Sequence, residues 1–476
     1  MKTITHVFIL CFLSFSVFSQ CPEGSLWIHS QEELDQFGEQ YPNCTEIDGL
    51  VNILETDVSD LTPLSNIEKI SGFLNILSND NLNSLHGLEK LTSTGTISIS
   101  DMDSIQDFTT LSNLETIRGL RITNCKDLES FDGLEKVRDC SSALVIGDNP
   151  KLKNIDAIKD ITEAQGFIIV NNNSLERLPN FYSLDYIYGQ HTTTNLITDN
   201  DNLLSLKGLD SIRDFGRFDI IRNPRLKSLD GLQGIKEQRF GIVWLDIAEN
   251  DSLVTLTGLE GLDSIYAQQA THGNIYIRNN PLLENVDALG NLEYLKGDLV
   301  IENNPKLSNL DGLSKLNAVE RNFIIENNSS LTSLAGLDSL DYTKFNSLTI
   351  SNCENLSFCS VKSICQAITN NANITIELNN EGCNDDEEVS EICLTSNEDL
   401  ITPKLILYPN PIKDFLFLEN TSDYSIESIR VYNSVGALVL QPNNTDSIDF
   451  REQPNGIYFI HIRIQDEVQL YKHIKI

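Results

Sequence analysis

The chain of 476 residues is strongly acidic, with 69 Asp and Glu residues against 34 Lys and Arg residues and a formal net charge of −35 at pH 7. Because nucleic acid is bound through a basic face, this charge excludes a general nucleic-acid-binding protein. The acidity fits either simple solubility or a cation-binding surface, although the sequence contains no Asp-x-Asp-x-Asp loop and no glycine-rich calcium repeat.

Residues 1–19 are predicted to be a signal peptide. Lys2 supplies the positive start, residues 7–18 form an apolar run, and the small residue Ser19 fits a cleavage site. The run is too short to span a bilayer, and no other apolar run is long enough, so no transmembrane segment is predicted. Export would make disulfide bonds permissible in the rest of the chain.

A short unit then recurs twelve times. In nearly every copy, two apolar residues stand five and three places before a turn position, and Leu or Ile stands three places after it. Most turn positions are 23–25 residues apart, and a fixed period in this range predicts a solenoid. The turn column consists of Asn79, Met102, Cys125, Asn149, Asn172, Asn200, Asn223, Asn250, Asn280, Asn304, Asn328 and Cys353.

The apolar residues before each turn alternate with period two, which predicts a short half-buried strand. The Leu and Ile residues after the turn would stack from coil to coil, because one coil alone buries too little apolar surface. The unit is too short and too rich in turn residues for a long helix. We therefore predict an all-β fold over residues 20–393, a right-handed parallel β-helix or leucine-rich solenoid of about 13 coils.

Asn in the turn column is predicted to be structural. A turn buried in a stack leaves backbone groups without water, and a side-chain amide can both donate and accept hydrogen bonds. Cys125 and Cys353 replace Asn in two coils, and they are either buried free thiols or members of disulfides.

Nine cysteines remain once Cys11 of the signal peptide is set aside, so at least one is free or pairs between chains. Seven of the nine lie near the two ends of the solenoid, where disulfides would staple coils that have only one neighbour. The sequence leaves open the pairing of Cys140, Cys359, Cys365, Cys383 and Cys393.

The two ends of the solenoid carry a family resemblance. The sequence Cys-Pro-Glu-Gly at 21–24, followed by Asn-Cys-Thr-Glu-Ile-Asp-Gly-Leu at 43–50, resembles the start of the receptor L domain, a ligand-binding β-helix. Residues 356–365 and 379–383 are similar to its cysteine-bearing terminal cap. The resemblance implies a disulfide between Cys21 and Cys44. Because this chain has about twice the expected number of coils, no ligand site of the family is transferred to it.

The repeats stop before a predicted linker at 394–404, and residues 405–476 read as short strands that predict a small antiparallel β-sandwich. Tyr-Pro-Asn-Pro at 408–411, Val-Tyr-Asn-x-x-Gly at 431–436, Asn-Gly-Ile-Tyr at 455–458 and a Lys-containing final strand follow in order. Together they resemble the type A C-terminal sorting domain of the type IX (Por) secretion system. The resemblance implies export by that machinery through the outer membrane of a Gram-negative bacterium, with the protein released or held at the surface.

A solenoid outside the cell predicts the binding of an extracellular protein or glycan rather than catalysis. Two other functions stay open, namely a polysaccharide-active β-helix enzyme with Asp, Lys and Arg on its sheet face, and a structural component of the surface layer. The sequence contains no metalloprotease, nucleophile-elbow or phosphate-loop motif and no zinc-like Cys/His spacing. No catalytic residue, metal ligand or cofactor is therefore predicted.

Three coils are longer than the others, with turn-to-turn steps of 28, 27 and 30 residues. The surplus precedes the strand of the next coil each time, so the inserts would stack along one edge, and inserts on one face of a solenoid often mark its binding surface. Alternatively, the inserts cover an apolar strip of outward strand residues, namely Val145, Ile168, Val170, Leu196 and Ile221. The candidate ligand face consists of Tyr182, Tyr186, Tyr188, Phe240, Trp244 and Tyr266.

Overall fold

The computed structural model describes residues 20–184, 187, 195–236, 238, 243–266, 273–395, 406–419, 426–434, 436–442, 447–464 and 467–476. The predicted signal peptide and nearly all of the predicted linker lie outside these residues. The chain divides into two compact units, with the boundary between Leu394 and Thr395.

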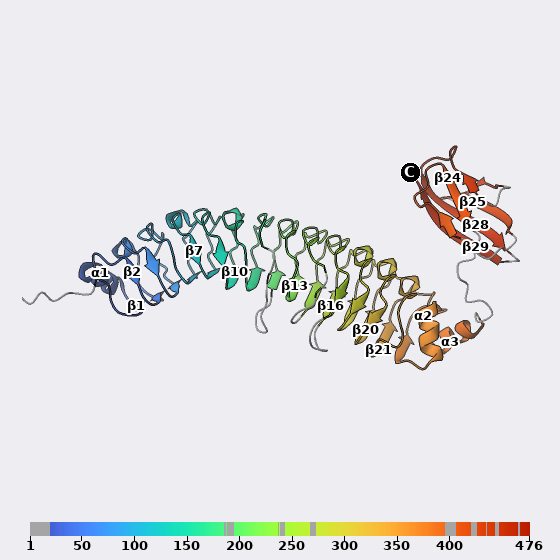
Figure 1. Cartoon of the computed structure of the whole chain (residues 1–476), viewed down its shortest axis with the longest axis horizontal. Coiled ribbons are helices and arrows are strands. Elements are labelled where there is room, and N and C mark those ends of the chain that lie inside the picture. Colours follow the sequence, from blue (N-terminus) through green and yellow to red (C-terminus); the bar gives the residue numbers. More distant parts are fainter. Residues whose placement is uncertain are drawn as a thin grey trace, which may run out of the picture. The chain divides into compact units, whose positions relative to one another are not determined.

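The first unit is a row of coils built on one parallel sheet of fifteen strands (Figure 1). Each strand between the two ends pairs with the main strands of the coils before and after it, so the order in the sheet follows the order in the chain. The strands are β1 (Leu26–Ile28), β3 (Val51–Leu54), β5 (Leu74–Leu77), β6 (Thr96–Ser100), β8 (Gly119–Thr123), β10 (Ala143–Gly147), β11 (Gly166–Val170), β12 (Asn195–Thr198), β13 (Arg217–Ile221), β14 (Trp244–Ala248), β16 (Asn274–Arg278), β18 (Leu299–Glu302), β20 (Asn322–Glu326), β21 (Ser347–Ser351) and β22 (Ile374–Glu377).

The alternation seen in the sequence explains the core. Leu299 and Ile301 of β18 point inward and are fully buried, and so are Phe323 and Ile325 beside them on β20. The strands add β1 and β3 before the twelve repeats and β22 after them. The predicted all-β solenoid is therefore confirmed, and it is longer at both ends than the repeats alone indicate.

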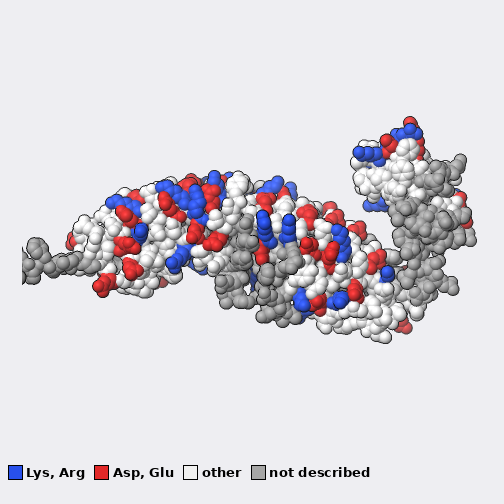
Figure 2. All heavy atoms as spheres, viewed as in Figure 1, with Lys and Arg blue, Asp and Glu red and all other residues white. Residues whose placement is uncertain are grey.

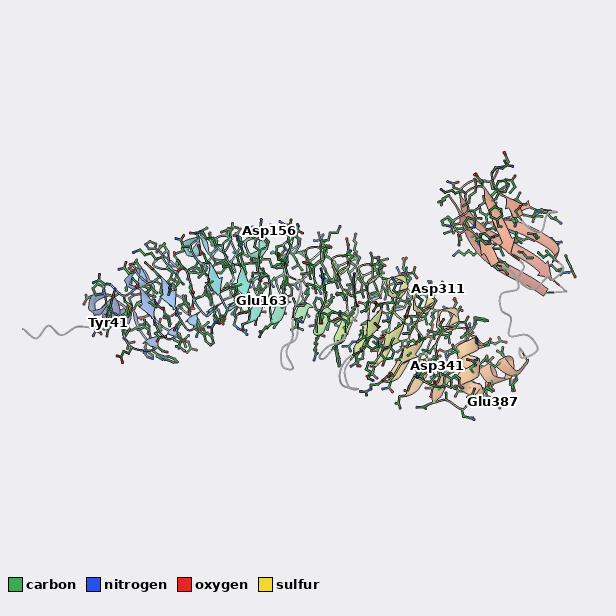
Figure 3. All side chains as sticks on the ribbon, in the orientation of Figure 1. Tyr41, Asp156, Glu163, Asp311, Asp341 and Glu387 are labelled. Atoms are coloured by element: carbon green, nitrogen blue, oxygen red, sulfur yellow. A yellow bond between two sulfur atoms is a disulfide. The ribbon has the colours of Figure 1, made fainter. Side chains whose placement is uncertain are left out.

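The other sides of the coils consist of turns, short bridges and 3-10 helices. In Figure 3, Asp156 and Asp311, which begin two of these helices, lie along the edge away from the main strands. The 3-10 helices are η1 (Thr62–Leu64), η2 (Thr109–Leu111), η3 (Asp156–Ile158), η4 (Asp287–Leu289), η5 (Asp311–Leu313) and η6 (Ala335–Leu337).

Two-residue strands form small parallel sheets just before the main strands. They pair as β2–β4, β7–β9 and β15–β17–β19, and each pair joins neighbouring coils. Their bounds are β2 (Glu46–Ile47), β4 (Lys69–Ile70), β7 (Thr116–Ile117), β9 (Asp139–Cys140), β15 (Ser264–Ile265), β17 (Tyr294–Leu295) and β19 (Ala318–Val319).

Helices and disulfides close the two ends of the solenoid. Helix α1 (Gln31–Gln40) buries Leu34 and Phe37 against the first coils, and a disulfide joins Cys21 and Cys44 beside it. At the other end lie α2 (Lys362–Thr369) and α3 (Asp386–Thr395). Two further disulfides link Cys359 to Cys383 and Cys365 to Cys393. Each end coil has a neighbour on one side only, so these caps cover core that water would otherwise reach.

The second unit consists of two antiparallel sheets, as expected for a small sandwich. Ile412, Leu416 and Ile448 pack against Val431 and Ile460 to form its core. One sheet contains β23 (Ile406–Tyr408), β24 (Phe415–Glu419) and β27 (Ser447–Asp449), and the other contains β26 (Leu438–Leu440), β25 (Ile426–Asn433), β28 (Gly456–Ile464) and β29 (Glu467–Lys475).

Candidate ligand-binding face

The turn-column Asn side chains form a ladder of hydrogen bonds along the solenoid. The Nδ2 of Asn223 donates to Ile197 O at 2.8 Å and to Ile221 O at 3.2 Å. Its Oδ1 accepts from the backbone N–H of Asn200 at 3.3 Å. These side chains have no solvent-exposed surface, so they hold coils together and do not face a ligand. The residues are Asn149, Asn172, Asn200, Asn223, Asn250, Asn280, Asn304 and Asn328.

The ladder extends beyond the residues that the repeat pattern reveals. Thr56 donates through Oγ1 to Asn79 Oδ1 at 2.6 Å, and Asn379 Oδ1 accepts from Cys353 N at 2.9 Å. Within the ladder, Cys125 Sγ lies 3.5 Å from Thr123 O, where the Asn side chains place their Nδ2.

Cys125, Cys140 and Cys353 are buried free thiols. For Cys125 and Cys353, this decides between the free thiol and the disulfide that the sequence left open. Burial raises the pKa of Cys125 and Cys140 to about 12 and that of Cys353 to about 11. Because the reactive species of cysteine is the thiolate, we expect these three thiols to be unreactive while the solenoid is folded.

The predicted ligand-face residues do not all lie together. Tyr186, Tyr188 and Phe240 lie outside the described residues. Tyr182 is 73 % exposed and accepts a hydrogen bond from Asn180 Nδ2 at 3.3 Å. It stands ten residues after its turn residue Asn172, whereas Tyr266 stands sixteen residues after Asn250. Tyr182 is therefore at a different position around the coil.

Trp244 and Tyr266 lie on either side of the edge at which the main strands begin. Trp244 is the first residue of β14, and its side chain is on the outward face of the sheet. Tyr266 directly follows β15, before the chain reaches β16. The two residues belong to the same coil.

Charged and aromatic side chains meet on the outward face of three neighbouring strands. The strand registers place Arg217 beside Trp244, and Asp219 beside Asp246, which in turn lies beside Tyr276. Neighbouring strands lie about 4.8 Å apart, so these side chains are in contact range. We call this set the sheet-face cluster, and it consists of Arg217, Asp219, Trp244, Asp246, Tyr276 and Arg278.

Two ion pairs fix the charged members of the cluster. Arg278 binds Asp246 through both ends of its guanidinium, with Nε–Oδ1 at 3.0 Å and Nη2–Oδ2 at 2.6 Å. Arg217 donates to one oxygen of Asp219, with Nη2–Oδ2 at 3.1 Å and Nε–Oδ2 at 3.3 Å. Two arginines therefore balance two carboxylates, and the cluster carries no formal charge.

The aromatic members pack against this network. The ring centroids of Trp244 and Tyr276 are 4.7 Å apart, and the guanidinium carbon of Arg217 lies 5.0 Å from the Trp244 ring centre. Such ring–ring and cation–ring contacts stabilise a fixed arrangement of the side chains. Burial raises the pKa of Tyr276 to about 12, so its hydroxyl stays protonated at neutral pH.

Two polar atoms of the cluster are buried without a hydrogen-bond partner in the described structure, namely Asp219 Oδ1 and Trp244 Nε1. Burial raises the pKa of the Asp219 carboxyl, the bond from Arg217 opposes that rise, and the neighbouring Asp246 adds to it. One of these atoms is an acceptor and the other a donor, and buried groups of this kind cost free energy unless a partner is supplied.

The cluster interrupts an apolar row. Along the middle of the outward face, Val145, Ile168 and Leu196 precede Asp219, and Val300 and Ile324 follow Tyr276. Val145 is only 5 % exposed, and Ile168 and Leu196 are half-buried. Val170 and Ile221, the other members of the predicted strip, are half-buried as well. Whether the inserts cover this strip stays a prediction.

An acidic groove of about 630 Å³ runs along the turns at the other end of the main strands. Asp199 and Arg222 meet across it, with Nε–Oδ1 at 2.6 Å and Nη2–Oδ2 at 2.8 Å. Figure 2 shows acidic and basic side chains interspersed over the visible face of the solenoid rather than separated into large patches. Within the described residues, no three His, Cys, Asp or Glu side chains are grouped so as to hold a metal ion.

Two protein-family models match this chain, one in the solenoid and one in the C-terminal unit. Residues 43–94 and 143–237 match the model of the Receptor L domain, and residues 406–476 match that of the Secretion system C-terminal sorting domain. Neither of these is an enzyme family. A search of curated proteins gave no match. No helix in the described parts of the chain has the length and apolar character needed to cross a membrane. The chain therefore joins a receptor L domain-like solenoid to a type IX secretion sorting domain, and it is directed to the cell surface or the outside of the cell.

Proposed function

We propose that this protein is a non-catalytic binding protein that the type IX secretion machinery exports, and that it holds an extracellular ligand on the sheet-face cluster. The observation that carries the proposal is the pair of orphaned buried atoms, Asp219 Oδ1 and Trp244 Nε1, within a rigid network of ion pairs and rings. A ligand that supplies both a donor and an acceptor would give each of these atoms a partner.

The position of the cluster supports the same proposal. The middle row of the sheet is polar at Asn52, Asn75 and Ser98, and it stays polar there even though Asn52 and Ser98 are buried. At β13–β16 it carries Asp219, Asp246 and Tyr276, although Asp is depleted in strands. A structural role alone would be met more simply by Ser, Thr or Asn.

The proposal is tested by comparing two tryptophans on the same sheet face. The purified chain is screened against an array of extracellular proteins and glycans, and the Kd of each hit is measured for Trp244→Ala and Trp27→Ala. Trp27 lies on β1 and is 55 % exposed, so it serves as the matched control. We expect Trp244→Ala to weaken binding at least tenfold, as at interface hot spots, and Trp27→Ala to leave the Kd unchanged.

Thermal melting of both variants separates binding from folding, because Trp244 is half-buried. If Trp244→Ala keeps the wild-type Kd for every hit, the cluster does not bind ligand and the proposal fails.

One observation favours a second function, a polysaccharide-active enzyme. The raised pKa of Asp219 and its unpartnered Oδ1 are features of a general acid, and Asp246 lies on the adjacent strand. Against catalysis, Arg278 holds both oxygens of Asp246. Reducing-end release from polysaccharides by the wild-type chain, abolished in Asp219→Asn, would establish the enzyme, and no release would leave the binding protein.

A further inference from the structure

Two aromatic pairs connect the same two coils of the solenoid. Trp244 on β14 packs on Tyr276 of β16. Tyr266, which directly follows β15, stacks on Tyr294, the first residue of β17. The ring centroids of Tyr266 and Tyr294 are 4.8 Å apart, with the planes inclined by 22°. Each ring of this stacked pair lies at the corner of its coil, just before the chain enters the next main strand.

Tyr266 is the most exposed of the four rings in these two pairs. It is 45 % exposed, whereas Trp244, Tyr276 and Tyr294 are half-buried. Its backbone N–H donates to Gln238 O at 2.8 Å, which ties the residue to the preceding coil. The stack therefore presents an aromatic face whose orientation is already set, so little conformational entropy is lost when a ligand packs on it.

The support beneath this ring is also fixed. The Tyr294 hydroxyl donates to Glu320 Oε1, and the other oxygen of Glu320 receives Lys296 Nζ at 2.7 Å. Lys296 and Glu320 are 29 % and 36 % exposed in their side chains, so both still reach solvent at the rim of the stack. Burial and the Glu320 carboxylate both raise the pKa of Tyr294, which keeps its hydroxyl a donor.

We propose that the Tyr266–Tyr294 stack is a sugar-binding platform for a neutral polysaccharide. The inference rests on the proposed function and names the ligand class. An aromatic face packs against the C–H face of a sugar ring, while a Lys–Glu pair at its rim exchanges hydrogen bonds with hydroxyl groups, which both donate and accept.

The balance of charge selects a neutral ligand. Lys296 is paired with Glu320 at the corner, and the two arginines of the sheet-face cluster are paired with its two aspartates. An anionic or cationic polymer would have to break one of these pairs, whereas a neutral sugar leaves all of them intact.

The surroundings of the stack disfavour a protein partner. The centre of a protein–protein interface is depleted of charge and packed with apolar side chains. Here the ring on which Tyr266 stacks is hydrogen-bonded to Glu320, which in turn pairs with Lys296, so two charged groups lie at the stack.

Affinity electrophoresis of the full chain tests the inference, with gels that contain a soluble β-1,3-glucan, a xylan or a mannan, and alginate as the anionic comparison. Tyr266→Ala removes the exposed ring, and Tyr294→Phe keeps the stack but loses the bond to Glu320. Tyr182→Ala is the matched control, since Tyr182 is more exposed and lies elsewhere on its coil.

We expect at least one neutral polysaccharide to retard the wild-type chain. Tyr266→Ala should bind it about tenfold more weakly, from the strength of an aromatic packing contact, and Tyr182→Ala should bind like wild type. Tyr294→Phe should weaken binding by a smaller factor.

No retardation by any of the neutral polysaccharides, retardation by alginate alone, or equal binding by Tyr266→Ala would each overturn the inference. A protein ligand lost in Trp244→Ala but kept in Tyr266→Ala would overturn it while leaving the proposed function standing. Loss of the same neutral polysaccharide in both variants would support the two proposals together.

Discussion

Replacement of Asn304 by Ala tests how much one rung of the turn ladder stabilises the solenoid. Asn304 Oδ1 accepts the backbone N–H of Asn280 at 3.1 Å, and its Nδ2 donates to Ile277 O and Glu302 O, each at 2.9 Å. Glu302 O keeps a second donor, the N–H of Asn279 at 3.0 Å. The Asn280 N–H has no such substitute within its turn, so the truncation leaves it buried and unpaired.

A buried backbone group without a partner costs about 1–3 kcal/mol, and the weakened carbonyl contacts add to this. We therefore expect Asn304→Ala to lower the free energy of unfolding by about 2–4 kcal/mol. Urea unfolding of the full chain, followed by far-UV circular dichroism, measures the loss. The slope with urea should stay constant, because the variant changes stability and not the surface exposed on unfolding.

The chain itself supplies the matched variant. Cys occupies this column at Cys125 and Cys353, where Sγ approaches the carbonyls of Thr123 and Ser351 at 3.5 Å. Asn304→Cys should therefore cost roughly half as much as Asn304→Ala, since a thiol keeps a weak donor toward the carbonyls. Lys306→Ala, an exposed change in the same coil, should stay within about 0.5 kcal/mol of wild type. Equal stability of Asn304→Ala and wild type would refute the structural role of the ladder.

Three further outcomes are expected. Replacing both Cys21 and Cys44 by Ala should lower stability by about 3 kcal/mol in the chain-entropy model, as measured by urea unfolding; an unchanged midpoint would contradict the cap's role. The three buried thiols should resist iodoacetamide at pH 8, where their raised pKa leaves almost no thiolate, and should react once urea is added; mass spectrometry detects the label. Deletion of 406–476 should leave a folded solenoid in the periplasm, and normal surface delivery in cell fractionation would exclude the sorting role.

The repeat made the stack predictable, because identical positions in successive coils meet identical neighbours. The two ends of the solenoid were harder to predict, because the sequences of the end coils depart from the repeat pattern. Thr56 replaces Asn in the first rung, and Gly382 stands where Leu is expected three residues after Asn379. Thr56 and Asn379 both join the ladder through their side chains, and only the structure reveals that they do.

The disulfides at the C-terminal end of the solenoid could not be predicted from the sequence, for a different reason. Four cysteines close together allow three pairings, and spacing does not choose among them. The choice depends on where α2 and α3 pack, since Cys365 lies on α2 and Cys393 on α3, and each helix position follows from burial of its own apolar face.

The sequence predictions did not include the sheet-face cluster, although the sequence contains a signal for it. The aromatic residues of the inserts predict a ligand face that contains Trp244 and Tyr266, but not Tyr276 or the ion pairs. Asp219 and Asp246 each stand between two inward apolar residues of a strand, at the same place in successive repeats. Asp is disfavoured at such positions, so its recurrence in one column was a detectable signal.

The local charge of this region contrasts with that of the whole chain. Acidic residues outnumber basic ones by 69 to 34, yet the sheet-face cluster has two of each and the Tyr294 corner has one of each. A chain with net charge −35 repels anions at long range, and salt screens that field beyond about 10 Å at 0.1 M. Within that distance the paired groups govern recognition. The acidity can therefore keep the exported protein soluble, while the balanced face admits a ligand that carries no charge.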